Sequence, residues 1–465
     1  MDKTGKQKIY EAALAAKERN ARRTAALSDR TSLEDYRHLV TENEGRAVWT
    51  AALSAALREH EIVVIPPSQE VYWLDGTVTV PSNRRIEAVG ATIRALPEYR
   101  YLMLRNEHAG DGTHAPIEGD DGDENVTILG GRWEENSTRH EVRRYSADPS
   151  VFCGVQTCML FNNITGLTVR DVTFASVGSF CLQVGDLRDG VFENFSFVSC
   201  YSDGLHINGN SRNLYIRNFS GDVGDDLVAL NMYDWLGSSV NYGPASHIFC
   251  EDIHSSPTGR SRAMRILAGI FIYDDGTAVD CAIRDVYVRS VSGIYEYKLY
   301  YQTPPYLLGE RPEGGGAGTI DNLFFEDIDI IASRPSYLPD VPVRGHFGMF
   351  ALSSKIGALS LENIRYTCRA DEGGRTHLIL VGPFSRCDGT REIFDPYIDG
   401  RVEALSLANI SINGEGVSDI GKLLKVIAFR DLNGDGHSSG SGSIGTVMLD
   451  GQRVTPPPTE IIALP

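Results

Sequence analysis

A short motif recurs along the chain, and its regular return restricts the possible folds more than any other feature. In each copy, apolar residues alternate around an Asn or Asp, and the first three copies are anchored at Asp171, Asn194 and Asn218, 23 and 24 residues apart. Later, more widely spaced copies are anchored at Asp252, Asp285, Asp327, Asn363 and Asn409. A period in the twenties, with strand-like alternation and no helical stripe between copies, predicts a β-solenoid. We expect each anchor to close a bend by bonding nearby backbone groups.

The length and charge of the chain are compatible with one long solenoid. The chain has 465 residues, 47 of them Gly, and a formal net charge of −18. A solenoid grows by adding turns, so this length still fits one unit. The acidic balance argues against a nucleic-acid partner, and no apolar run is long enough to span a membrane. Residues 1–8 lack an apolar signal core, which favours a cytoplasmic location.

The N-terminal region differs from the repeats. Residues 4 to about 60 are predicted to be helical, with helices at Lys6–Ala26 and Arg46–Leu57. The second helix would plug the open end of the solenoid, where core and strand edges are exposed. The predicted domains are therefore a helical segment and cap (1–60) and a parallel β-helix with long inserted loops (61–465).

Several segments outside the repeat have weaker signals. The eight cysteines show no metal-ligand spacing and are expected to be free thiols. The acidic, Gly-rich stretch 109–124 is either solvated or ion-binding. Residues 431–443 begin like a calcium loop but lack the acidic residue at position 12, so a flexible turn is preferred. Long inserts are expected to form walls beside one sheet at 232–247, 300–318 and 332–345.

Two acidic motifs occur about one repeat apart. Asp203 lies in Tyr201–His206, and Asp225 and Asp226 lie in the Gly-Asp-Asp that follows. Equal phase in successive turns means neighbouring in space, roughly 4.8 Å per turn. The three carboxylates should therefore gather on one face, which is costly unless function requires it. A lone Ser-Asp-Gly is usually only a turn, but a Gly-Asp-Asp at the matching phase favours a site.

Aligning the repeats predicts further neighbours. Phe180, Asp203 and Asp226 share one phase, at a strand edge where a bend can turn the aspartates outward. A second row, containing His206, Arg265 and Lys298, should run along an exposed face beside the carboxylates. Two further rows are predicted to be core: Leu182, Leu205 and Val228, and then Val184, Ile207 and Leu230.

This constellation suggests cleavage of a glycosidic bond. One carboxylic acid would protonate the leaving oxygen while another carboxylate activates water or attacks the sugar. Like-charge repulsion within the cluster would raise at least one proton affinity. The predicted catalytic residues are Asp203, Asp225 and Asp226. The predicted substrate-binding residues are His206, Asn231, Arg262, Arg265, Lys298 and Trp235. Alternatively, the basic residues only neutralise the acidic patch, His206 is a ladder residue, and Trp235, Tyr233 and Tyr242 pack the loop rather than stack on a sugar.

At these residues the chain resembles glycoside hydrolase family 28, the polygalacturonase-like enzymes on a right-handed parallel β-helix. Tyr201–His206 is similar to the family's Asn-Thr-Asp-Gly-x-Asp, and Gly224-Asp-Asp matches its second motif at the same separation. His206 stands where the family has another Asp. No Gly-His-Gly follows, although His247 or His254 could approach from the preceding segment, and the Arg-Ile-Lys position reads Ile294-Tyr-Glu-Tyr-Lys298. The resemblance covers about residues 45–300 and implies acid and base roles for the three aspartates.

The sequence thus predicts an all-β fold, a right-handed parallel β-helix with an N-terminal helical cap. The predicted function is an inverting glycoside hydrolase acting on an oligosaccharide, with a uronate-containing one as an option, and with no cofactor or metal. Asp226 or Asp203 is the preferred acid and Asp225 a candidate base. One alternative is a polysaccharide lyase or epimerase with Lys298, Arg265 or His206 as base. Another is a carbohydrate-binding β-helix without catalysis. The sugar and the oligomeric state stay open.

Overall fold

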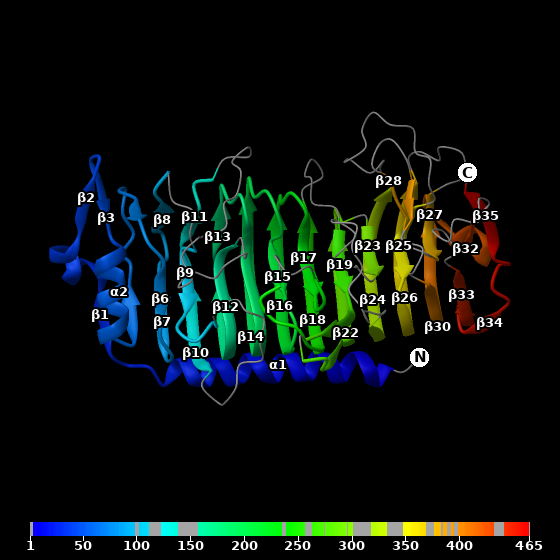
Figure 1. Ribbon diagram of the computed structural model, residues 1–465, viewed down its shortest axis with the longest axis horizontal. Helices are drawn as coiled ribbons and strands as arrows, with labels where there is room; N and C mark the ends of the chain where they lie inside the picture. Colours follow the sequence, from blue (N-terminus) through cyan, green and yellow to red (C-terminus); the bar gives the residue numbers. More distant parts are fainter. Residues whose placement is uncertain are drawn as a thin grey trace.

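The predicted parallel β-helix is confirmed by a computed structural model of the chain (Figure 1). The structure describes residues 3–97, 102–110, 122–137, 157–234, 239–255, 263–273, 275–294, 296–300, 318–332, 347–368, 376–382, 385–387, 392–394, 399–431 and 441–464. Successive coils pair side by side in parallel, so strands far apart in the sequence form continuous stacks.

Three stacks of parallel strands form the walls of the solenoid. The first stack contains β1 (Arg30–Ser32), β4 (Ile62–Val64), β7 (Arg84–Glu87), β10 (Asp123–Leu129), β12 (Thr157–Arg170), β14 (Phe180–Val198), β16 (Ser211–Gly221), β18 (Ala245–Ser255), β22 (Ile283–Ser292), β24 (Thr319–Ala332), β26 (Lys355–Cys368), β30 (Gly400–Ile412) and β33 (Gly442–Leu449). The second stack contains β3 (Arg46–Val48), β5 (Tyr72–Leu74), β8 (Thr92–Ala95), β11 (Arg132–Glu134) and β13 (Thr173–Ala175), and it merges into the end of β14.

The third stack carries the predicted site. It contains β6 (Val78–Val80), β9 (Leu104–Asn106), the first parts of β12 and β14, β15 (Leu205–Ile207), β17 (Asp226–Asn231), β19 (Ala263–Leu267), β23 (Glu296–Tyr300), β25 (Phe347–Ser353), β27 (Thr376–Val381), β32 (Leu424–Asp431) and β35 (Glu460–Leu464). The long strands β12 and β14 run through a corner and so belong to two stacks.

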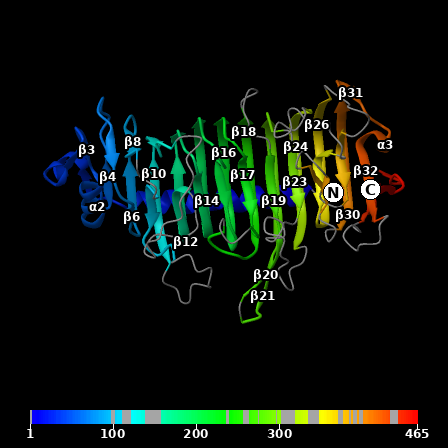
Figure 2. The same cartoon turned by 45° about the horizontal axis from the view of Figure 1, so that its top comes forward.

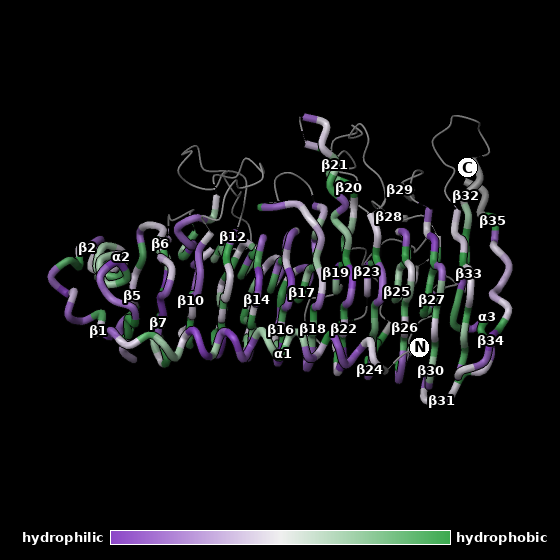
Figure 3. Tube along the Cα trace, turned by 90° about the horizontal axis from the view of Figure 1, so that it is seen from below, coloured by the Kyte–Doolittle hydropathy of each residue, from purple (hydrophilic) through white to green (hydrophobic). Residues whose placement is uncertain are grey.

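Alternation along the strands fills the interior with apolar rows. Leu182, Leu205 and Val228 are register partners in successive coils, as predicted, and all three are fully buried. The row of Val184, Ile207 and Leu230 is equally buried. Figure 3 shows this as hydrophobic and hydrophilic positions alternating along the coils. Period-two alternation therefore gave the correct register, because a slip of one residue would turn every core side chain outward.

The repeat anchors form a bend at the same place in each coil. Each of the eight predicted anchors has a positive φ, for example +59° at Asp171 and +57° at Asn218. Asn and Asp tolerate this left-handed conformation better than other residues with a Cβ atom. The side chains also link coils: Asn194 Nδ2 donates to Asp171 Oδ1 at 2.6 Å, and Asn218 Nδ2 donates to Asn194 Oδ1 at 2.7 Å. The anchors thus stabilise both the bend and the stacking.

Helix α1 (Lys3–Ala25) does not cap the solenoid but lies along its outer side (Figure 1). Its buried residues include Ile9 and Ala13, which pack on an apolar row of the first stack formed by Val191, Tyr215, Phe249, Tyr287 and Phe324. Basic side chains bind acidic ones along the way: Lys6 lies 2.8 Å from Glu326, and Arg19 lies 2.6 Å from Asp189. At about 1.5 Å per residue the helix is about 34 Å long, so it crosses about seven coils.

The cap at the first coil is α2 (Thr50–Glu59), whose Leu53, Ala56 and Leu57 are buried in the main core. The helical prediction for residues 4 to about 60 is wrong between the two helices. There the chain forms β1, the 3₁₀ helix η1 (Leu33–Leu39), β2 (Thr41–Asn43) and β3. Because β1 pairs with β4, solenoid pairing starts before residue 61. The division into two domains remains a prediction.

Smaller elements decorate the coils. Strands β20 (Gly269–Ile272) and β21 (Ala278–Cys281) form an antiparallel hairpin that projects from the solenoid (Figure 2). The others are β2, which pairs with β3, and β28 (Ser385–Cys387), β29 (Glu392–Phe394), β31 (Glu415–Gly416), β34 (Gln452–Val454) and α3 (Ile420–Leu423). Six described cysteines are free, as predicted for them. None of the described helices is long and apolar enough to cross a membrane.

Candidate active site

A β-bulge turns Asp226 toward the outer face of the third stack. By strict alternation Asp226 would have the same parity as the core residue Val228. However, Asp226 is the partner of Ala263 and Val228 is the partner of Met264, so β17 has one extra residue, Leu227, between these pairs. Asp226 therefore faces the same side as Arg265, two residues after Ala263. Bulges of this kind often redirect a side chain next to an active site.

The three aspartates meet as the spacing predicted. Asp203, Asp225 and Asp226 each offer an oxygen, and these oxygens all lie within 4.8 Å of one another. Glycines allow this close approach, because a Cβ on Gly224 would lie 1.8 Å from the carbonyl oxygen of Tyr201. Asp203 Oδ1 also accepts a hydrogen bond from the Asp226 N–H at 3.2 Å. The Gly-Asp-Asp motif thus fixes its own aspartates against the preceding coil.

The environments of the three carboxyl groups differ strongly. Asp226 and Asp203 are buried, at 0% and 1% exposure, whereas half of the Asp225 side chain is exposed. Burial raises the pKa of Asp226 well above its usual value; Arg265 opposes this, and the charges of Asp225 and Asp203 add to it. Asp226 is therefore the group most strongly favoured to keep a proton at neutral pH. Asp226 has the outward turn that was expected, but neither Asp226 nor Asp203 reaches solvent, because neighbouring groups cover them.

Arg265 connects the two adjacent aspartates. Its Nε lies 2.8 Å from Asp226 Oδ2, and its Nη2 lies 3.3 Å from Asp225 Oδ1. The first contact lacks hydrogen-bond alignment, since neither Asp226 oxygen accepts an aligned hydrogen bond from the described part of the chain. Arg265 thus contacts Asp226, and most of the Arg265 side chain is itself shielded from solvent.

The predicted basic row exists, but it is not exposed throughout. The strand partners run His206, Ala229, Arg265 and Lys298, in the predicted order. His206 is fully buried, so its predicted place on an exposed face is wrong; neighbouring side chains enclose the ring. Lys298 is 15% exposed and lies 3.4 Å from Glu296. Arg265 and Lys298 are the members of this row that a ligand can approach.

His206 belongs to a buried polar network below the aspartates. Its Nδ1 lies 2.6 Å from Asp203 Oδ2, and its Nε2 lies 3.6 Å from Asp234 Oδ2. Asn231, also fully buried, donates from Nδ2 to Asp234 Oδ2 at 2.9 Å, so its amide faces this network. Sequence reasoning missed Asp234 because the residue lies in an insert, beyond the last repeated position, where phase gives no signal.

Other predicted residues lie outside the site or outside the described residues. Arg262 and Trp235 are not among the residues that the structure describes, and their substrate-binding roles remain predictions. Most of the inserts 300–318 and 332–345, and residues 432–440 of the possible calcium loop, are also undescribed. His247 and His254 lie on β18 in the first stack, where they contact Ser246 and Ser292 rather than the aspartates.

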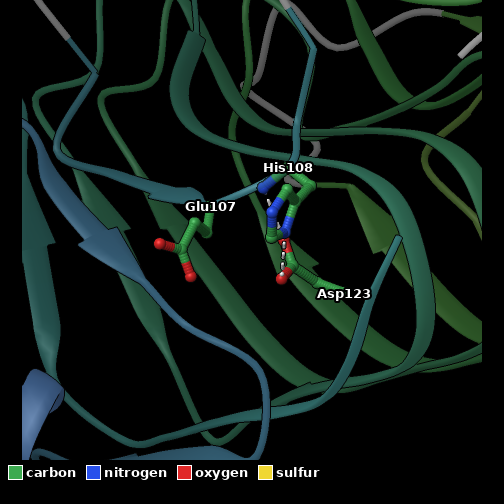
Figure 4. Close-up of side chains that lie close together, drawn as sticks. All are labelled: Glu107, His108 and Asp123. Carbon is green, nitrogen blue, oxygen red and sulfur yellow. Dashed lines mark hydrogen bonds and ion pairs between the residues drawn. The ribbon is translucent and has the colours of Figure 1, made fainter. Parts of the chain in front are cut away.

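Two described clusters have the proximity needed for a metal ion, and in each of them carboxylate oxygens already contact protein groups. In the aspartate cluster the Arg265 guanidinium supplies the positive charge, and Asp203 already has partners on both oxygens. In the second cluster, Glu107 and His108 lie near Asp123 (Figure 4). Both oxygens of Asp123 are taken: Oδ1 contacts Ser82 and His108, and Oδ2 accepts from Asn106 and the His108 N–H. This arrangement fits a structural carboxylate at the start of β10.

Comparison with known proteins gives likeness to solved structures only. No family model matches the chain, and no curated protein does. The chain is similar to the family 28 exopolygalacturonase of Yersinia enterocolitica, at 11% identity and a TM-score of 0.43, covering 92% of this chain and 79% of that one. For the polygalacturonase of Erwinia carotovora these values are 11%, 0.46, 83% and 95%. For the surface adhesin PfbA of Streptococcus pneumoniae they are 11%, 0.44, 92% and 89%. The function is therefore argued from the site itself.

Proposed function

We propose that the protein hydrolyses a glycosidic bond in an oligosaccharide, with Asp226 as general acid. The observation that carries this proposal is a buried carboxyl group with a raised pKa, beside an exposed carboxylate at most 4.8 Å away. Such a difference between neighbouring environments separates an acid from a base at one pH. Asp203 is the less suitable of the two candidate acids, because one of its oxygens contacts His206 and the other accepts the Asp226 N–H.

In this proposal Asp225 is the second carboxylate. It is exposed, and its Oδ1 lies 3.3 Å from Arg265 Nη2, so it is placed to activate water or attack the sugar. Arg265 lies on Asp226 and would have to leave Oδ2 when a sugar binds. Arg265 and Lys298 would then be available to hold an acidic sugar. The oxygen spacing is closer to the ~5–5.5 Å carboxyl separation of retaining glycosidases than to the ~6.5–9.5 Å of inverting ones, so it does not support inversion.

The test is to incubate the protein with a panel of labelled oligosaccharides and to follow the anomeric configuration of the products by NMR. Asp226→Asn and Asp225→Asn should each lower kcat about 10²–10⁴-fold, the usual contribution of general acid–base catalysis. Asp75→Asn, at an exposed turn, is the matched control. Asp226→Asn with wild-type turnover would disprove the assignment of the acid.

The burial of Asp203 and Asp226 favours a second candidate, glycan binding without cleavage, because Asp226 reaches a bound sugar only if Arg265 moves away. This candidate predicts a saturable binding isotherm with no product, unchanged by Asp226→Asn. The lyase or epimerase alternative has fewer groups available as a base. His206 is enclosed and Arg265 is paired with two carboxylates, which leaves Lys298. An unsaturated product that absorbs in the ultraviolet would identify a lyase.

A further inference from the structure

The ring of His206 is held on every side and is closed to any ligand. Its exposure is 0%, and it stacks on Phe180 with 4.1 Å between ring centroids and 15° between ring planes. The register of the coils produces this stack, because Phe180 precedes Asp203 by one coil at the same phase. A sugar hydroxyl therefore has no path to either ring nitrogen in this arrangement. The chemistry of His206 must act through its protein neighbours.

Each ring nitrogen faces a different carboxylate. Nδ1 lies 2.6 Å from Asp203 Oδ2, and Nε2 lies 3.6 Å from Asp234 Oδ2. Asn208 Nδ2 lies 3.3 Å from Nε2, and it also donates to the Asn231 carbonyl oxygen at 2.9 Å. Gln183 Nε2 donates to Asn208 Oδ1 at 2.7 Å. These contacts join three successive coils and prevent rotation of the imidazole.

We propose that His206 is a positioning residue, whose ring fixes the Asp203 carboxylate against the start of β17 and thereby sets the place of Asp225 and Asp226. This inference rests on the proposed function for its catalytic consequence. Asp203 is the connecting group: Oδ2 contacts His206, while Oδ1 accepts the Asp226 N–H at 3.2 Å. Without the ring, the carboxylate is free to rotate away from that N–H.

Charge gives the positioning a chemical effect. A negative Asp203 opposes a second negative charge on its neighbour and so keeps a proton on Asp226. The charged and titratable groups that face this unit are Asp203, Asp234, Asp225, Asp226, Arg265 and Lys298. If Asp203 rotates away from Asp226, this repulsion weakens and Asp226 loses its proton at a lower pH. The alkaline limb of the activity profile should then move to lower pH.

The test compares His206→Asn with His206→Gln. The amide nitrogen of Asn falls near the former Nδ1 and can donate to Asp203, whereas that of Gln falls near the former Nε2. We expect His206→Gln to lower kcat at least tenfold, with KM within twofold of wild type and the alkaline limb shifted to lower pH. His206→Asn should keep a kcat at least tenfold above that of His206→Gln. Melting temperatures of the two variants are compared to exclude a difference in folding.

The possible outcomes separate this inference from the proposed function. A raised KM with unchanged kcat would make His206 a substrate ligand and overturn the inference, as would equal losses in both variants. If the wild type cleaves no glycan, the proposed function fails, and the positioning contact is read directly instead. In ¹⁵N-histidine-labelled wild type we expect a hydrogen-bonded Nδ1–H signal that is missing in His206→Gln. Absence of that signal in the wild type would overturn the inference, whatever the activity.

Discussion

At Asp226, one extra residue in a strand decides the direction of a side chain. Leu227 occupies the bulge and is buried, so Asp226 leaves the core parity and lies beside Arg265. The Asp226 side chain is enclosed by protein, which disfavours its charged form. Alternation alone predicts a core position for Asp226, and only the bulge explains why an acid is tolerated there.

The raised pKa of Asp226 gives a pH-dependent stability difference. Above the unfolded pKa of about 3.9, the folded wild type holds a proton that the unfolded chain has lost. The contribution of protonated Asp226 to the stability of the folded state is complete below the unfolded pKa. It is lost as pH rises through the folded pKa. Asp226→Asn carries no such group, so its stability relative to wild type should increase with pH from about 4 upward, by about 1.4 kcal/mol per unit of pKa shift. Urea unfolding at several pH values measures this difference, and a constant difference would contradict it.

Gly224 lies too close to the preceding coil to carry a side chain. A Cβ at this position would lie 1.8 Å from the Tyr201 carbonyl oxygen, so Gly224→Ala must push two coils apart beside the aspartates. We expect the variant to lose most activity and to lower the melting temperature. Gly416→Ala is the control, because no atom lies within 4 Å of its added Cβ. Equal behaviour of the two variants would show that coil spacing at Gly224 is not limiting.

Among the elements, helix α1 is held on the solenoid by specific polar contacts. Asn20 is 2% exposed, and its Nδ2 donates to the carbonyl oxygens of Leu167 and Asp189, at 3.1 and 2.7 Å. Lys17 Nζ lies 4.7 Å from the centre of the Tyr215 ring and 2.6 Å from Glu193. Polar contacts thus join the helix to successive coils around a small apolar seam.

Asn20→Ala should destabilise the contact between α1 and the solenoid. The substitution leaves two buried carbonyl groups without their side-chain donor, which costs about 1–3 kcal/mol. Amide hydrogen exchange in β12 and β14 should become faster, and the melting temperature should fall. Gln7→Ala is the matched control, since Gln7 is exposed and its Nε2 donates to the exposed Glu11 on the same helix. Unchanged exchange in Asn20→Ala would show that α1 contributes little at this point.

The stacking of coils determines how cooperatively the whole molecule unfolds. In a solenoid each coil contacts chiefly its neighbours, so coils can open locally and unfolding need not be all-or-none. Helix α1 adds contacts that span about seven coils, from the Asn20 region to Lys6 on Glu326 and Glu362. It therefore links coils that do not touch one another.

Removal of residues 1–26 should reduce the cooperativity of the whole solenoid. The transition in calorimetry is expected to broaden or divide, and exchange should increase in β16, β18, β22 and β24, which α1 no longer covers. The cap α2 and the core rows remain, so the shortened chain should keep its β-sheet circular dichroism. A single sharp transition at the wild-type temperature would contradict the proposed coupling by α1.

The sequence by itself determined the repeat, the register and the gathering of the aspartates. Coils of nearly equal length with period-two alternation leave one arrangement that buries the apolar rows, so Asp203 and Asp226 had to become neighbours. The order His206, Arg265, Lys298 follows from the same rule.

Tertiary structure decided which groups are covered. The contact of His206 with Asp234 and the path of α1 along the coils depend on segments outside the repeat, and the bulge at Leu227 interrupts the repeated phase locally. The helical propensity of residues 3–25 predicts a helix but not its position, because a weakly apolar seam of Ile9, Ala13 and Ala16 fits several surfaces. Periodicity specifies neighbours along the stack, whereas burial depends on packing from outside it.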